Sequence, residues 1–107
     1  MTSELLGLGL IDKADVQNED PNWPAYKKYF MHGTSHHMGL DTHDYGLLWE
    51  PMKANMVFTV EPGIYIPEEG FGIRLEDDVV IQENGAPLNL MKNIPIEVEE
   101  IEDVMNS

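Results

Sequence analysis

HGTSHHMGLDTHD (residues 32–44), MVFTVEPGIYI (residues 56–66) and GIRLEDDVVI (residues 72–81) are the three segments that decide the fold of this chain. The first contains all four histidines of the protein, and the third contains its single arginine. A general surface would scatter these residue types along the chain. Their concentration in a protein without cysteine indicates a functional site and raises the question of a metal.

The histidine segment is predicted to be extended chain and tight loops, because its glycines each cost about 1 kcal/mol relative to alanine in a helix. In an extended chain His32 and His36 share one face, and His37 points to the other. His43 follows after a turn. Taken singly, each histidine is better explained as a polar loop or core residue, but four within residues 32–43 favour a site.

Strands are predicted from the β-branched and aromatic residues of 56–60 and 64–66. Between them, Pro62 followed by Gly63 fits the central positions of a type II turn. A second turn is predicted at 67–70. Residues 71–82 predict either a pair of strands or one long bent strand, and the apolar side chains at 73, 75, 79 and 80 indicate that it is buried.

Short helices are predicted near both ends of the chain. Residues 3–6 predict either the start of a short helix or the last turns of a longer one, which glycines end. Residues 24–30 predict one or two helical turns, and residues 95–106 space most of their apolar side chains on one helical face. Residues 12–24 are polar and predict a surface connection. The fold class is therefore α+β, a mostly antiparallel sheet with short helices, in a single domain over 1–107.

Composition excludes several classes of function. Twenty Asp and Glu residues against six Lys and Arg give a formal charge of −14. This charge argues against nucleic acid and anionic membranes as partners, since both reward basic residues. No run approaches the ~20 apolar residues of a membrane helix. The absence of cysteine excludes disulfides and thiolate zinc sites, and it fits a cytoplasmic protein.

Two glutamates complement the histidines as possible metal ligands. Glu61 ends an apolar strand, and the turn after it holds the side chain in place. Arg74 and Glu76 are two residues apart, so in one strand they project to the same face. A buried carboxylate there needs a cation, which is either the arginine or a metal. Nitrogen and oxygen ligands without sulfur suit Mn²⁺, Fe²⁺ or Co²⁺, and Zn²⁺ can also use them.

The three segments, in this order and spacing, resemble the C-terminal half of the catalytic domain of the Xaa-Pro aminopeptidase (aminopeptidase P) and prolidase family. The resemblance runs from about Pro24 to Ile101, and aminopeptidase P is the nearer match. It implies the pita-bread fold that this family shares with methionine aminopeptidase and creatinase.

The resemblance also implies a role for individual residues. The implied metal ligands are His36, Glu61 and Glu76, with Glu61 also acting as the general base. His43 would contact the substrate and stabilise the tetrahedral intermediate. His32 would line the proline-side pocket, and Arg74 would orient the ligands. His37 matches a position without an assigned role.

The implied reaction is hydrolysis of the bond before proline by two divalent ions, with Mn the preferred guess and Co, Zn or Fe possible. The substrate would be a peptide with proline at its second position. The family's site also uses two aspartates and a further histidine from the preceding part of the domain, and nothing before His32 matches them. The chain is therefore expected to be a partial domain that is inactive alone.

Two further expectations concern partners and alternatives. Half of a pita-bread sheet exposes an apolar face and a strand edge, so the chain is expected to form a homodimer or to associate with the missing half. The alternative function is a non-catalytic pita-bread module that binds peptides or proteins. A third interpretation is an acidic structural fragment whose histidines bind metal adventitiously.

Overall fold

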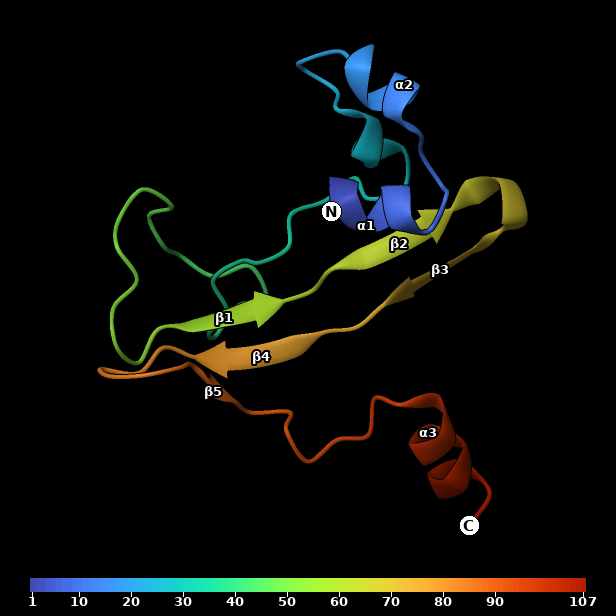
Figure 1. Cartoon of the computed structure of the whole chain (residues 1–107). Coiled ribbons are helices and arrows are strands. Elements are labelled where there is room, and N and C mark those ends of the chain that lie inside the picture. Colours follow the sequence, from blue (N-terminus) through green and yellow to red (C-terminus); the bar gives the residue numbers. More distant parts are fainter. The chain divides into compact units, whose positions relative to one another are not determined.

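The structure is a computed structural model that describes all 107 residues, and its chain divides into two compact units. The first unit contains residues 1–33 and 62–74, and the second contains residues 34–61 and 75–107. Figure 1 shows the order of helices and strands along the chain. The prediction that residues 1–107 form one partial domain of a larger catalytic domain stays a prediction.

The first unit packs short helices on a two-stranded hairpin. Its elements are α1 (Thr2–Gly7), α2 (Lys13–Gln17), the 3₁₀ turn η1 (Ala25–Lys28), β2 (Gly63–Ile66), the 3₁₀ turn η2 (Pro67–Glu69) and β3 (Phe71–Arg74). Its core is formed by Leu5, Ile11 and Tyr29, against which Ile64 and Ile66 of β2 pack. The Tyr65 N–H donates to the Tyr29 carbonyl at 2.8 Å, which ties the hairpin to this core.

The second unit is built on a three-stranded antiparallel sheet of order β1-β4-β5. The strands are β1 (Val57–Val60), β4 (Asp77–Val80) and β5 (Leu88–Asn89), and the C-terminal helix is α3 (Val98–Met105). The histidine segment runs along the edge of β1 that β4 leaves free, where Met38 donates to the Val57 carbonyl at 3.0 Å. The antiparallel sheets and short helices confirm the predicted α+β class.

Three local predictions differ from the structure. The connection over 12–24 contains α2, because Asp12 and Asp15 form a reciprocal capping box that stabilises a five-residue helix. The type II turn at Pro62-Gly63 is wrong, since Gly63 lies in β2 opposite Arg74 and lacks the positive φ that this turn requires. In contrast, Gly70 ends η2 at a φ of 71°, as the second predicted turn needs.

The third difference concerns residues 71–82, which form a pair of strands rather than one bent strand. The prediction that these residues are buried is wrong for β3 and the residue after it, because Ile73 is 64% exposed and Leu75 is 53% exposed. Val79 and Val80 in β4 are half-buried. The apolar composition of β3 therefore does not predict its burial, because β2 is its only strand neighbour. None of the helices has the length and apolar content that crossing a membrane would need.

Candidate active site

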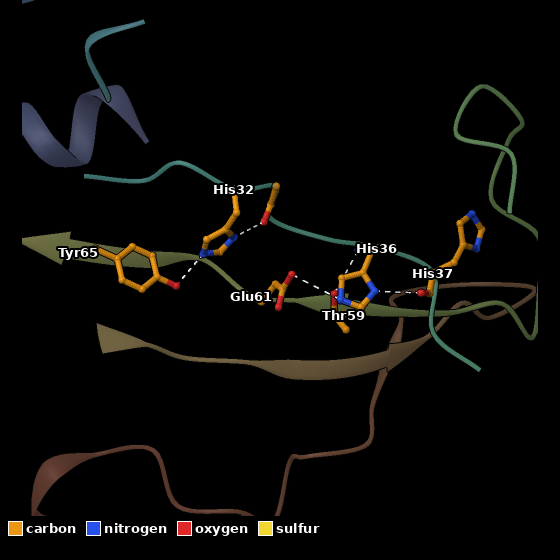
Figure 2. Close-up of polar contacts among 7 residues, drawn as sticks. His32, His36, His37, Thr59, Glu61 and Tyr65 are labelled. Carbon is orange, nitrogen blue, oxygen red and sulfur yellow. Dashed lines mark hydrogen bonds and ion pairs between the residues drawn. The ribbon is translucent and has the colours of Figure 1, made fainter. Parts of the chain in front are cut away.

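His36 is held against β1 by hydrogen bonds from both its backbone N–H and its backbone carbonyl. Its N–H donates to Thr59 Oγ1 at 3.1 Å, and its carbonyl accepts from the Thr59 N–H at 3.0 Å. Glu61, one residue beyond β1, donates its own N–H to the Thr34 carbonyl at 2.7 Å. The backbone therefore carries His36 and Glu61 on neighbouring extended segments with a fixed register (Figure 2).

The imidazole of His36 has a defined polarity. Its Nδ1 lies 2.9 Å from the His37 carbonyl oxygen. A carbonyl can only accept, so Nδ1 carries the proton and the neutral ring keeps its lone pair on Nε2. That nitrogen lies 3.5 Å from Glu61 Oε1, and both side chains are largely buried, with 20% and 14% of their surface exposed.

A lone pair and a carboxylate oxygen that face each other need a positive charge between them. A proton on His36 is one answer, and a divalent cation is the other. Two ligands that each lie about 2.1 Å from one ion are about 3.0–3.5 Å from each other, depending on the coordination geometry. The His36–Glu61 separation of 3.5 Å and its nitrogen-and-oxygen chemistry therefore fit two ligands of one metal ion.

Glu76 is not brought into this pair. It is exposed and lies between the end of β3 and the start of β4. The chain contains no group of three or more His, Asp or Glu side chains placed to hold one ion. The structure thus joins two of the three expected ligands, and the assignment of Glu76 as a bridging ligand stays a prediction from the resemblance.

The remaining histidines of the second unit differ in what they contact. His43 is exposed and makes an edge-on ring contact with His36, with centroids 4.3 Å apart. This places it beside the candidate metal ligands, within reach of a molecule bound there. The His37 ring packs against the Phe58 ring instead, with centroids 4.4 Å apart.

His32 belongs to the first unit, where its ring is fixed at both nitrogens. Nδ1 lies 2.7 Å from the Gly33 carbonyl oxygen, and Nε2 lies 2.7 Å from the Tyr65 hydroxyl. Because the carbonyl can only accept, Nδ1 is the donor and Nε2 accepts the Tyr65 proton in the neutral ring. Phe30 covers the ring edge-on at 4.7 Å. His32 is thereby held in one orientation and is half-buried.

Tyr65, whose hydroxyl contacts the His32 ring, was not singled out from the sequence. The signal was present in the glycines around it, because a Cβ on Gly72 would come 2.6 Å from Tyr65 Cδ1 and one on Gly63 would come 2.9 Å from its hydroxyl. The hairpin register places Gly72 directly opposite Tyr65 and Gly63 opposite Arg74. Because these glycines have no side chain, the Tyr65 ring has room to lie where its hydroxyl reaches His32.

The resolved pKa shifts lie away from these residues. The N-terminal ammonium lowers the pKa of Glu4 to about 2. Hydrogen bonding to Tyr29, and then to Glu68, raises the pKa of Lys28. The Lys28–Glu68 pair is exposed at 3.4 Å, and exposed pairs contribute little to stability. These charges therefore tune the surface of the first unit rather than the candidate site.

Comparison with known proteins identifies the family. The sequence profile of metallopeptidase family M24 matches residues 9–83. The chain is 44% identical to the Xaa-Pro aminopeptidase of Escherichia coli (strain K12), over 98% of this chain and 26% of that protein. It is 37% identical to Xaa-Pro aminopeptidase 3 of Homo sapiens, over 97% of this chain and 23% of that protein.

Solved structures agree with this relationship. Aminopeptidase PepP of Pseudomonas aeruginosa matches with a TM-score of 0.80 and 37% identity, over 98% of this chain and 26% of that one. A putative aminopeptidase P from Bacillus anthracis matches with a TM-score of 0.79 and 41% identity, over 98% of this chain and 23% of that one.

The chain therefore has the pita-bread fold of the aminopeptidase P structures and belongs to metallopeptidase family M24. This confirms the family and the fold class expected from the three sequence segments. The chain spans about a quarter of the length of the relatives it matches. The family is one of peptidases that use divalent metal ions, and the His36–Glu61 pair offers two ligands of suitable chemistry for such an ion.

Replacing Tyr65 by phenylalanine is expected to release His32. The Tyr65→Phe protein loses the hydroxyl that donates to Nε2, and a single buried hydrogen bond contributes about 1 kcal/mol. Long-range ¹⁵N–¹H NMR spectra of the histidine rings should show the His32 Nε2 signal shifting and the preference for Nδ1 protonation weakening. Tyr45→Phe is the matched control, because Tyr45 is 87% exposed. An unchanged His32 spectrum in Tyr65→Phe would contradict this geometry.

Proposed function

We propose that this chain supplies part of the active site of a dinuclear metal-dependent Xaa-Pro aminopeptidase. The observation that carries the proposal is the His36–Glu61 pair, in which His36 Nε2 and a carboxylate oxygen of Glu61 face each other at 3.5 Å. The substrate would be a peptide with proline at its second position, and prolidase activity is the less favoured specificity. The relatives named Xaa-Pro aminopeptidase support this choice.

The bound ions would lower the pKa of a shared water and polarise the scissile carbonyl. Mn²⁺ is the proposed metal, with Co²⁺, Zn²⁺ or Fe²⁺ as alternatives of similar ligand preference. His36 would hold an ion through Nε2, because Nδ1 is committed to the His37 carbonyl. Glu61 would share that ion and accept the proton of the attacking water, since its carboxylate is held beside His36 and largely shielded from solvent.

Other residues would act on the substrate or on the ligands. His43, exposed at the edge of the His36 ring, would donate to the oxygen on which negative charge develops. His32 would line the pocket for the proline side of the scissile bond, with its orientation fixed by Tyr65. Glu76 would add a bridging ligand, and Arg74, the last residue of β3, would orient the ligands.

Partial ligation explains why the chain alone is proposed to be inactive. Two ligands cannot saturate even one four-coordinate ion, and the chain has no group of three or more His, Asp or Glu side chains placed to hold one ion. The missing ligands would come from the part of the family's domain that this chain does not cover. A cytoplasmic location is proposed with this function, because a chain without cysteine has no need of an oxidising compartment.

Titration with Mn²⁺ tests the metal site. Isothermal calorimetry on the 107-residue chain should show a site of micromolar affinity, because two oriented and largely buried ligands bind before any exposed carboxylate does. His36→Gln and Glu61→Gln should each weaken binding at least tenfold, and Glu76→Gln should weaken it too if that residue bridges. Glu69→Gln is the matched control, since Glu69 is an exposed glutamate of η2.

Equal weak binding in the wild type and every variant would overturn the metal site and favour adventitious binding by acidic residues. Absence of binding, together with capture of peptides that have proline at the second position, would favour the non-catalytic binding module.

Peptide cleavage tests the incomplete site. The purified chain with Mn²⁺ should release no detectable N-terminal residue from an Xaa-Pro peptide, as measured by chromatography of the products. Addition of a polypeptide that carries the remainder of an M24 catalytic domain should restore cleavage, and the Glu61→Gln chain should not. Robust turnover by the 107-residue chain alone would show that the ligands present are sufficient.

Self-association is proposed for the isolated chain. Leu48 and Trp49 in the second unit are 83% and 81% exposed, and Leu75 is 53% exposed. Apolar surface of this kind favours an interface, either between two copies or with the remainder of the domain. Gel filtration over a hundredfold concentration range should show elution shifting toward a dimer. A clean monomer at every concentration would contradict this proposal.

A further inference from the structure

Thr59 is the one polar residue that the chain buries fully, with 1% of its surface exposed. It lies in β1, two residues before Glu61 and beside His36. Its hydroxyl oxygen accepts the His36 N–H at 3.1 Å. A hydroxyl group also has a proton to donate, and a buried donor without an acceptor is destabilising. The question is therefore where the Thr59 proton goes.

The sheet register places Asp78 directly opposite Thr59 in β4. The backbone of Thr59 turns away from β4, because its N–H bonds to the His36 carbonyl. The backbone carbonyl of Asp78 turns the other way and accepts from the Leu90 N–H at 2.9 Å. The two residues thus form a non-hydrogen-bonded antiparallel pair. Side chains of such a pair lie on one face, with Cβ atoms about 4.5–5.5 Å apart.

Asp78 has a buried acceptor atom that lacks a donor. Its Oδ1 is buried and has no hydrogen-bond partner, and it is the only buried side-chain nitrogen or oxygen in the chain with this property. A buried carboxylate oxygen without a donor is more costly than a neutral group in the same position. One buried donor proton and one buried acceptor therefore face the same side of the sheet from directly opposite positions.

We infer that the Thr59 hydroxyl donates its proton to Asp78 Oδ1, so that Asp78 positions His36 through Thr59. Asp78 Oδ1 has no hydrogen-bond partner in the structure, so forming this bond requires the Asp78 side chain to rotate. The carboxylate polarises the hydroxyl and makes its oxygen a stronger acceptor for the His36 N–H, as in any hydrogen-bonded chain. The chain runs from Asp78 through Thr59 to His36, and it fixes the backbone from which the imidazole reaches Glu61.

The consequence for metal binding rests on the proposed function. Groups that orient a metal-binding histidine typically change metal affinity by 10–100-fold when they are removed. Asp78 would then be a positioning residue, and it would touch neither metal nor substrate. Its neighbour Asp77 pairs with Val60, which projects to the opposite face. Asp77 therefore provides a matched control with the same charge, the same strand and no access to Thr59.

Amide hydrogen exchange, read by NMR on the 107-residue chain, tests the hydrogen-bonded chain without any metal. The His36 amide should exchange about tenfold faster in Asp78→Ala and in Thr59→Val, and within twofold of wild type in Asp77→Ala. Thr59→Ser keeps a hydroxyl and should restore slow exchange. The Met38 amide, which bonds to the Val57 carbonyl on the same edge of β1, should stay unchanged in Asp78→Ala.

Two results would overturn the inference. One is an Asp78→Ala protein in which the His36 amide is as slow as in wild type. The other is equal acceleration of the His36 and Met38 amides, which would show general loosening of the segment rather than positioning of His36.

The wild-type protein provides a second measurement that does not depend on variants folding. A buried hydroxyl that donates to a carboxylate exchanges slowly, so a Thr59 hydroxyl proton signal should appear with a cross-peak to the Asp78 β-protons. Failure to find that cross-peak would also overturn the inference.

Mn²⁺ affinity then separates this inference from the proposed function. Asp78→Ala should weaken Mn²⁺ binding about tenfold, whereas Asp77→Ala and Thr59→Ser should bind as wild type does. If wild-type protein binds no Mn²⁺, the proposed function fails, and the exchange of the His36 amide still decides whether Asp78 acts on His36.

Discussion

The candidate site depends on one backbone constraint, the antiparallel alignment of the histidine segment with the free edge of β1. The reciprocal bonds between His36 and Thr59, together with the Glu61 N–H to Thr34 carbonyl bond, fix the register of the two segments. A slip of one residue would turn every side chain to the opposite face. His37 would then face Glu61, and the imidazole of His36 would pack where Phe58 now holds His37. The chemistry of the site is thus decided by hydrogen bonds that involve no ring atom.

Much of this arrangement could be predicted from local sequence. The β-branched residues of 57–60 predicted β1, and glycine in the histidine segment excluded the helix that an i, i+4 pair of histidines would otherwise suggest. Prediction failed where partners are distant in sequence. Gly63 was interpreted as a turn residue, although it serves to leave space for Tyr65 across the hairpin. β3 was predicted to be buried from its apolar residues, but burial depends on what covers a strand, and its exposed residues show that nothing in its own unit does.

For the candidate site residues too, local sequence indicated which residues matter, whereas distant partners determine how they are held. His36, Glu61 and His32 were identified by residue type and resemblance, and the structure adds what fixes each of them. The tautomer of His36 follows from the His37 carbonyl, and the orientation of His32 follows from Tyr65. Thr59 carried no signal in the sequence, because a threonine in a strand is ordinary. Its importance arises from complete burial and from the residue opposite it, and both depend on the register of strands that lie about 20 residues apart in the sequence.

The acidity of the chain does not by itself explain a metal site. Twenty carboxylates attract divalent cations at long range, but exposed carboxylates are hydrated and mobile, and ordering them costs side-chain entropy. The His36–Glu61 pair differs because backbone hydrogen bonds have already fixed both residues and burial has removed most of their water. Folding has therefore already ordered the His36 and Glu61 side chains before an ion binds. Selectivity of the site over the remaining acidic surface therefore derives from preorganisation of one nitrogen and one oxygen, and the net charge only raises the local concentration of cations.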